Sequence, residues 1–161
     1  MKTLFTLLFL TATIFFAVTA LQCSNPPPAP NFTLSGYLGL WYEIARIQTA
    51  GGAFFQKNCV CTTITMTPPT VPDSNATTID QCREYSPEGE LTTDIGQLFN
   101  ENPPGKFQEQ FYSYVPPVTY TVIILNETYA VEYDCGTSAG ITNYCIHVMS
   151  RTPTMDPALL N

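Results

Sequence analysis

Eight segments of strand-like composition follow one another along the chain, and this succession constrains the fold more than any other feature. They span residues 39–48, 58–66, 77–85, 91–99, 106–114, 119–125, 128–135 and 143–151. Short joints rich in Gly, Pro, Asn and Ser separate them, so segments that are neighbours in sequence should pair as antiparallel neighbours in space. No helical periodicity long enough for a crossover lies among them, which excludes a parallel sheet.

A meander of eight strands can close on itself and so satisfy its edges, and eight strands leave an interior large enough for one small ligand. We therefore predict an all-β fold, an eight-stranded antiparallel up-and-down β-barrel. The competing architecture is a sandwich of two sheets. The Cys, Trp, Cys order of the immunoglobulin type does not occur, because Trp41 precedes Cys59 and the chain has a single Trp.

Residues 1–20 have the form of a secretory signal peptide. Lys2 precedes an apolar stretch, and the small side chains at Val18 and Ala20 fit the cleavage pockets, so we place the cut after Ala20. Residues 21–161 then form one domain, since they are too few for two of ordinary size. The alternative is an uncleaved anchor, because residues 4–21 are long enough to span a bilayer. We expect a secreted, extracellular protein with no integral membrane span in its mature form.

The charge of the chain excludes one group of partners. Thirteen Asp and Glu stand against six Lys and Arg. One of the six is Lys2 in the leader, so the formal charge of the remainder is 5 minus 13, or −8. Nucleic acid and anionic membranes bind through clustered Lys and Arg, which this chain lacks.

Six cysteines, all beyond the leader, suit an oxidising compartment and allow up to three disulfides in 15 pairings. A metal site is not predicted, because Cys59 and Cys61 are too close in sequence for a zinc knuckle and His147 is the single histidine. No cofactor is predicted either. Three acceptor sequons, at Asn31, Asn75 and Asn126, indicate a glycoprotein.

Three stretches carry a resemblance to a known family. Residues 37–46 read Tyr-Leu-Gly-Leu-Trp-Tyr-Glu-Ile-Ala-Arg after a Cys-Ser-Asn-Pro-Pro arm at 23–27, and residues 128–135 and 149–153 fit the same pattern. From residue 23 to 161 the chain resembles the lipocalin family. The resemblance implies a lipocalin-like calyx whose closed end is built on Gly39, Trp41 and Arg151, with the guanidinium across the indole ring.

Two departures from the family pattern stand out. The family's Thr-Asp-Tyr signature before the seventh strand is absent, and residues 125–128 occupy its place. Asp156 followed by Pro157 marks a helix start where the family has a long outer helix, yet the chain stops at Asn161. We therefore expect the C-terminal helix to be truncated or absent.

The preferred disulfides are Cys23 with Cys135, Cys61 with Cys82, and Cys59 with Cys145. One branch of the family implies the first pair, which pins the proline-rich arm, whereas another branch implies a bond within the hairpin, here Cys135 with Cys145. Cys61 and Cys82 lie at near-mirror positions about the turn between the second and third strands. Cys59 with Cys145 is the pair that remains.

Side-chain alternation selects the candidate ligand contacts. On the fifth strand Phe107, Glu109 and Phe111 share one face, which should point inward. On the last strand His147 and Met149 share the parity of Arg151. The predicted ligand-binding residues are Ile47, Phe107, Phe111, Tyr120, His147 and Met149, of which Tyr120 rests on the resemblance. The alternative for His147 is an interior or surface histidine without a role in binding.

The seventh strand allows two orientations. Hydrophobic patterning turns Tyr129, Val131 and Tyr133 inward. The resemblance implies the opposite, with Glu132 facing the cavity and the tyrosines outward.

The resemblance implies a secreted carrier that binds one small hydrophobic ligand, such as a fatty acid, sterol, retinoid or pigment, and that is not an enzyme. Two alternatives are a protein-binding or inhibitory module that uses open-end loops at 67–76 and 136–142, and a lipid isomerase with a pocket thiol. An acid–base pair of Glu43 and Glu109 is a further catalytic possibility. A protein receptor, if there is one, is not specified by the sequence.

Overall fold

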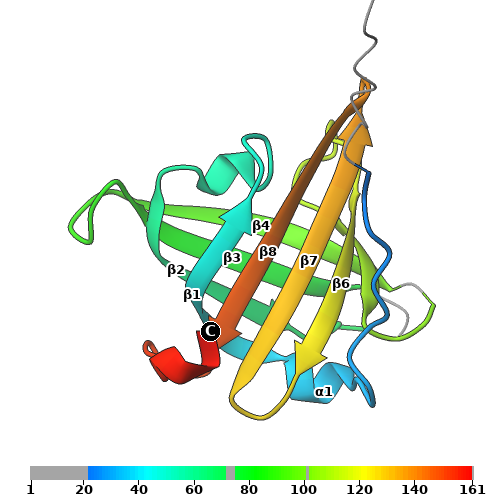
Figure 1. The fold of residues 1–161 in the computed structure, drawn as a ribbon, viewed down its shortest axis with the longest axis horizontal. Coiled ribbons are helices and arrows are strands. Elements are labelled where there is room, and N and C mark those ends of the chain that lie inside the picture. Colours follow the sequence, from blue (N-terminus) through cyan, green and yellow to red (C-terminus); the bar gives the residue numbers. More distant parts are fainter. Residues whose placement is uncertain (1–21, 72–74, 101, 161) are drawn as a thin grey trace, which may run out of the picture.

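The computed structural model describes residues 22–71, 75–100 and 102–160, so the predicted signal peptide and cleavage position lie outside the described residues. Eight antiparallel strands form a closed barrel in chain order, and β1 also pairs with β8 (Figure 1). The predicted barrel is confirmed, and the two-sheet sandwich is excluded. The strands are β1 Gly39–Gln48, β2 Cys59–Thr67, β3 Ala76–Glu84, β4 Leu91–Asn100, β5 Lys106–Gln110, β6 Val118–Leu125, β7 Tyr129–Ser138 and β8 Ile141–Ser150.

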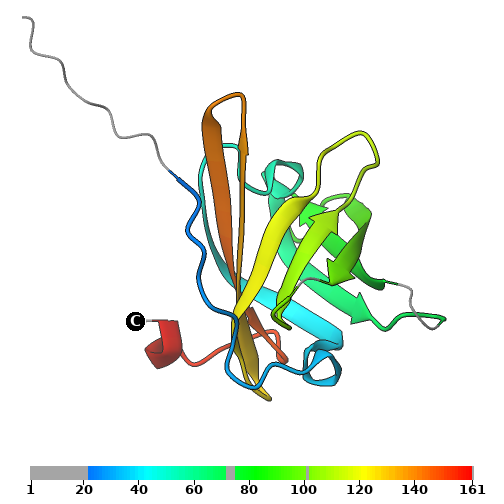
Figure 2. The same cartoon turned by 90° about the vertical axis from the view of Figure 1, so that its right-hand side faces the viewer.

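The bounds of three strands differ clearly from the prediction. β5 ends at Gln110 instead of residue 114, because the chain turns there, with the Val115 N–H donating to the Tyr112 carbonyl and the Gln110 amide to the Val115 carbonyl. β7 and β8 run on to a two-residue turn at Ala139 and Gly140, both with positive φ, which suits a tight hairpin. This hairpin rises above the other strands (Figure 2).

Three short helical turns accompany the barrel. α1 Leu34–Tyr37 crosses the closed end (Figure 1) and begins at Thr33, whose Oγ1 accepts a hydrogen bond from the Gly36 N–H. The 3₁₀ turn η1 Phe54–Gln56 lies between β1 and β2, and η2 Pro157–Leu160 is the one turn that forms where the family's outer helix would begin. Across the described residues, no helix is long and apolar enough to cross a membrane.

Arg151 and Trp41 close one end of the barrel. The Trp41 side chain is fully buried, and the Arg151 Cζ lies 3.5 Å from the centroid of its ring system. The guanidinium also donates to the carbonyls of Gly36, Leu38 and Leu40 at 2.8–2.9 Å, while Trp41 Nε1 donates to the Tyr37 carbonyl. β8 is thereby fastened to α1 and to the start of β1, as the resemblance implied.

Both the backbone conformation at position 39 and the nearby Arg151 side chain require a glycine there. Its φ of +95° is a conformation that residues with a Cβ rarely adopt. A Cβ there would lie 3.3 Å from a terminal nitrogen of Arg151. The glycine therefore permits the guanidinium to reach across the indole.

The hydrophobic core gathers at this closed end. Trp41 and Tyr37 pack with Phe107 and Met149, and Phe107 stacks against Tyr37 with ring centroids 6.4 Å apart. The remaining members of the cluster are Ile64, Met66, Ala76, Leu98, Tyr120, Val122 and Ala130. Because the core fills the closed half, the other half of the barrel is left for a cavity.

A break in the ladder of β1 overturns one predicted ligand contact. The pairing of β1 with β8 shifts between Glu43 and Ala45, so one extra residue enters β1 there. Trp41 lies inward before the break, whereas after it Ile47 is 61% exposed on the outer surface. A one-residue shift reverses the face of every later side chain, and the prediction that Ile47 lies in the cavity is wrong.

The disulfides are Cys23–Cys135 and Cys59–Cys82. The first is the preferred pairing, and it excludes the alternative bond of Cys135 with Cys145. It holds the proline-rich arm against β7, where the Ser24 N–H donates to the Tyr133 hydroxyl and the Ala29 N–H to the Val122 carbonyl of β6.

The other two predicted pairings, Cys61 with Cys82 and Cys59 with Cys145, are wrong, and Cys61 and Cys145 are unbonded. The ladder of β2 with β3 shifts between Val60 and Thr63, and Cys61 takes a left-handed φ of 52° and is exposed. The mirror symmetry about the turn, which suggested the first pair, is lost at that bulge. Cys145 is buried and pairs in register with Gln48 and Asp134 of β1 and β7, away from β2.

We predict that Trp41→Ala lowers the free energy of unfolding by about 3–5 kcal/mol, because it empties the centre of the floor and leaves Arg151 without its ring. Urea unfolding followed by circular dichroism measures the change. The control is Ile95→Ala, at a side chain that is 58% exposed on β4, and it should cost less than about 1 kcal/mol. A Trp41→Ala loss no larger than that of the control would contradict the role given to the floor.

Candidate functional site

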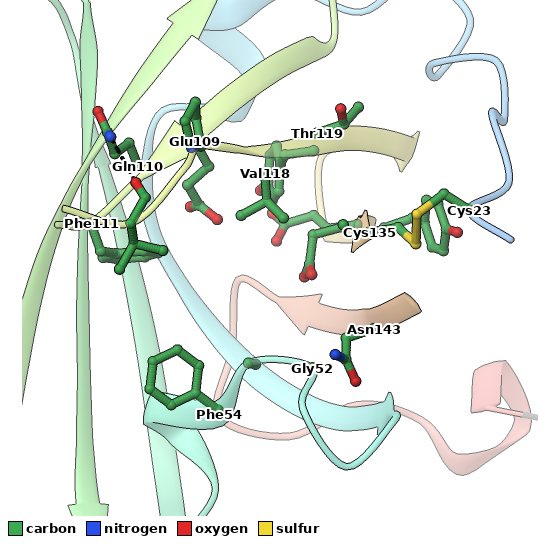
Figure 3. A pocket seen from close by; sticks show the side chains of 18 of the residues that line it. Cys23, Gly52, Phe54, Glu109, Gln110, Phe111, Val118, Thr119, Cys135 and Asn143 are labelled. Carbon is green, nitrogen blue, oxygen red and sulfur yellow. Dashed lines mark hydrogen bonds between the residues drawn. A yellow bond between two sulfur atoms is a disulfide. The ribbon is translucent and has the colours of Figure 1, made fainter. Parts of the chain in front are cut away.

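A cavity of about 760 Å³ occupies the half of the barrel away from Trp41. Its mouth is formed by the loop after β1 that carries η1, by the β5–β6 loop and by the upper β7–β8 hairpin, and Figure 3 shows side chains from all three around one space. Its aromatic lining includes Phe54, Phe55, Phe111, Tyr112 and Tyr120. This volume falls in the range of sites for single small molecules.

The structure sorts the predicted contacts by depth. Phe111, Tyr120 and His147 line the cavity. Phe107 and Met149 are buried in the core below it. Phe107 of β5 is buried, whereas Glu109 and, directly after the strand, Phe111 line the cavity. Contact of these side chains with a ligand remains a prediction.

One loop assigned to the open end lies at the other end. Gly39 pairs with Met66, so the β2–β3 connection begins beside the floor. The 136–142 hairpin does reach the mouth. Residues 67–71, 75 and 76, the described part of this segment, are therefore not part of the open-end surface.

Glu132 settles the orientation of β7. It is 1% exposed and accepts a hydrogen bond from the Tyr37 hydroxyl, which is itself hydrogen-bonded to the Tyr120 hydroxyl. The prediction from hydrophobic patterning, with Tyr133 inside, is wrong. Outside the barrel the proline-rich arm covers Tyr133, and inside it a tyrosine hydroxyl donates to the Glu132 carboxyl. Burial raises the pKa of Glu132 to about 7, although His147 and the two tyrosine hydroxyls oppose the shift.

Asp80 is a second interior carboxyl, and the sequence reasoning did not select it. Thr78 Oγ1 donates to it at 2.8 Å and Gln56 Nε2 at 2.7 Å. Arg46 holds Gln56 in place by donating to both its side-chain and backbone oxygens. Burial raises the pKa of Asp80 to about 6, against the hydrogen bond from Thr78. Its parity with buried Ala76 and Cys82 on β3 was the available signal.

His147 lies between two carboxylates. Its Nδ1 is 2.6 Å from Glu43 Oε1, and its Nε2 is 3.2 Å from Asp134 Oδ2. Burial opposes protonation, but hydrogen bonds with Asp134, Cys145 and Glu43 raise the pKa of His147 well above its ordinary value. Each ring nitrogen of His147 therefore has a carboxyl oxygen as its hydrogen-bond partner. Glu43 is the partner of His147 here rather than the predicted catalytic partner of Glu109.

Three of these residues could hold a metal ion. Asp134, Cys145 and His147 each place one ligand atom within 4.8 Å of the others. Sequence spacing did not suggest this group, because pairing of β7 with β8 brings its members together. Both ring nitrogens of His147 already contact carboxyl oxygens. A metal ion bound to His147 would therefore have to replace the hydrogen bond between His147 and Asp134.

Glu109 differs from the other interior carboxyls. Within the described part of the chain it has no hydrogen bond and no ion pair, and its side chain points into the cavity (Figure 3). Burial raises the pKa of Glu109 well above its usual range, and the negative charges of Asp80, Asp134 and Glu132 raise it further, while His147 acts in the opposite direction. It is a carboxyl group held in the barrel without a partner.

A closed antiparallel barrel of eight strands, stoppered at one end and hollow at the other, defines the class of calyx proteins. The family model described as a lipocalin-like domain matches residues 32–161, and the chain belongs to this family. It is similar to apolipoprotein D from Rattus norvegicus, with 29% identity over 140 residues that cover 84% of this chain and 69% of the relative. Apolipoprotein D from Bos taurus is 26% identical over the same shares.

Among solved structures, lobster apocrustacyanin A1 has the same fold. The TM-score is 0.59 at 15% identity, over 79% of this chain and 67% of that chain. At this identity the likeness concerns the fold alone.

We predict that Glu132→Gln flattens the pH dependence of stability. The pKa of Glu132 is about 7 in the folded chain against an ordinary 4.5. The folded state therefore keeps a proton that the unfolded state loses as the pH rises from 4.5 to 7, and stability falls across this window. Removing the carboxyl should abolish a loss of up to about 3 kcal/mol.

Urea unfolding at pH values from 4 to 8 measures this effect. The control is Glu88→Gln, at an exposed position in the β3–β4 turn, which should leave the wild-type slope unchanged. A Glu132→Gln slope equal to that of the wild type would show that this carboxyl does not titrate with a raised pKa.

Proposed function

We propose that this protein is a secreted carrier that binds one small hydrophobic molecule in the barrel cavity. The observation that carries the proposal is the cavity of about 760 Å³ above a packed floor. Its wall is aromatic on one side, where Phe55 and Phe111 lie with ring centroids 4.7 Å apart. Apolar ligand surface buried there contributes roughly 25 cal/mol per Å², which is enough to hold a molecule of lipid size. The name of the relatives, apolipoprotein D, supports a lipidic ligand.

The thiols give no support to an isomerase. Cys59 is bonded to Cys82, and Cys61 is exposed on the outer surface of β2. Burial raises the pKa of the Cys145 thiol, although His147 opposes the shift, so Cys145 is a poor nucleophile. We therefore propose binding without catalysis.

We predict that Phe111→Ala and Tyr120→Ala each weaken binding of a neutral hydrophobic probe about five- to thirtyfold, because each removes aromatic surface from the cavity wall. Titration of a probe such as N-phenyl-1-naphthylamine, with its own fluorescence as signal, measures the dissociation constant. Tyr114→Ala is the control, since Tyr114 is exposed and does not line the cavity. Unchanged affinity in both cavity variants, or native mass spectrometry that shows an empty barrel bound to a protein partner, would overturn the carrier proposal.

Secretion has its own test. Expression of the full chain in a secreting animal cell line should release a protein whose first residue is Leu21, because cleavage is expected after Ala20. Digestion with an N-glycosidase should lower its mass, and replacing Asn31, Asn75 or Asn126 by Gln should remove one glycan each. A chain that stays in the membrane fraction with its leader attached would contradict the proposal.

A further inference from the structure

The cavity carries more negative than positive groups. Four carboxyl side chains, Asp80, Glu109, Glu132 and Asp134, line it, and His147 is the one basic side chain among the lining residues. Interiors that bind purely apolar molecules have few polar groups. If the protein is a carrier, as proposed above, this excess of carboxyl groups indicates that its ligand is not purely apolar.

His147 does not balance this surplus. Its two ring nitrogens already contact Asp134 and Glu43. Arg46, which lies behind η1 outside the cavity lining, is 3.6 Å from Glu43 and donates to Gln56. His147 and Arg46 therefore already have partners, and neither pairs with Asp80, Glu109 or Glu132.

Two of the other carboxyl groups accept hydrogen bonds from neutral donors. Asp80 accepts from Thr78 and Gln56. Glu132 accepts from Tyr37. Within the described residues, Glu109 has no such donor, and its carboxyl projects into the open space of the cavity (Figure 3). The Glu109 side chain is partly accessible from the cavity, and a ligand that fills this space would take water away from an unpaired carboxyl, which is costly unless the ligand supplies a partner.

The surroundings of Glu109 suit a positive charge. Asp80 lines the same cavity from β3, Glu132 and Asp134 from β7, and His147 from β8, so three carboxyls and one histidine surround the Glu109 side chain. Phe111 follows the last residue of β5, two positions after Glu109, and lines the cavity together with Phe55. Aromatic faces attract cations in a site that excludes water.

We propose that the cavity selects a cationic amphiphile, an organic amine with an apolar body, whose protonated nitrogen pairs with Glu109. This deepens the carrier function and rests on it. A bound ammonium group supplies the donor that Glu109 lacks and offsets the repulsion among the interior carboxyls. A ligand carboxylate would add another negative charge to the same space.

The test compares three ligands that differ only in their head group. Decylamine, decanol and decanoate are each used to displace N-phenyl-1-naphthylamine from the wild-type protein at pH 7.5. The amine should bind about tenfold or more tightly than the alcohol, and the carboxylate weakest, because a close charge pair in a buried site is worth at least one tenfold step. Decanoate or decanol binding as tightly as the amine would overturn the proposal.

Glu109→Gln assigns the effect to its residue. This change keeps the shape of the side chain and removes its charge, so the ratio of the decylamine and decanol affinities, both measured on the same variant, isolates the contribution of the carboxylate. The preference for decylamine over decanol should fall to about onefold, whereas Glu88→Gln should retain the wild-type preference. An amine preference that survives in Glu109→Gln overturns the pairing with Glu109.

The experiment distinguishes failure of the carrier function from failure of the cationic-ligand proposal. If the neutral probe and all three decyl ligands fail to bind the wild-type protein, the carrier function itself is wrong. If the probe binds and the amine is not preferred, the carrier function stands and the cationic ligand is wrong.

Discussion

The stacking of Arg151 on Trp41 is the interaction on which the rest of the barrel depends. Eight strands of this length could close around a filled interior or leave a tube open at both ends. The guanidinium covers the indole and donates to the carbonyls of Gly36, Leu38 and Leu40, so the end of β8 is fastened across the floor to α1 and the start of β1. All the large apolar side chains that pack tightly then gather above this pair. The cavity is the volume that they leave.

The strand pattern was predictable because it is repeated eight times, whereas single irregularities were not. Turn residues and period-two alternation place every strand within a few residues of its observed bounds. Each bulge adds one residue, and this reverses inside and outside for the part of the strand that follows. Ile47 and Cys61 were both misplaced for this reason. A bulge has no local signature here, since both bulged segments consist of ordinary strand residues.

The candidate site shows a second limit of sequence reasoning. Phe111 and His147 were found from side-chain parity along their strands, and Tyr120 from the family resemblance. Asp80 was missed, and hydrophobic patterning turned Glu132 the wrong way. Such patterning assumes that an interior is dry and apolar, which holds for the floor but not for a hollow half whose walls carry tyrosine, threonine and glutamine donors. Those donors come from α1, β3, β6 and η1, and only the closed barrel brings them to the carboxyls.

The interior carboxyls also connect ligand binding to stability. Burial raises the pKa of both Asp80 and Glu132, which means that the folded barrel holds these groups in their charged form at a cost. Hydrogen bonds from neutral donors reduce that cost but add no positive charge. A chain selected for stability alone would have no use for Glu109, because a glutamine of the same size fits without the penalty. A cation that binds the folded barrel and not the unfolded chain would stabilise it in proportion to its affinity, so the carboxyls that weaken the empty barrel are the ones that would favour its loaded form.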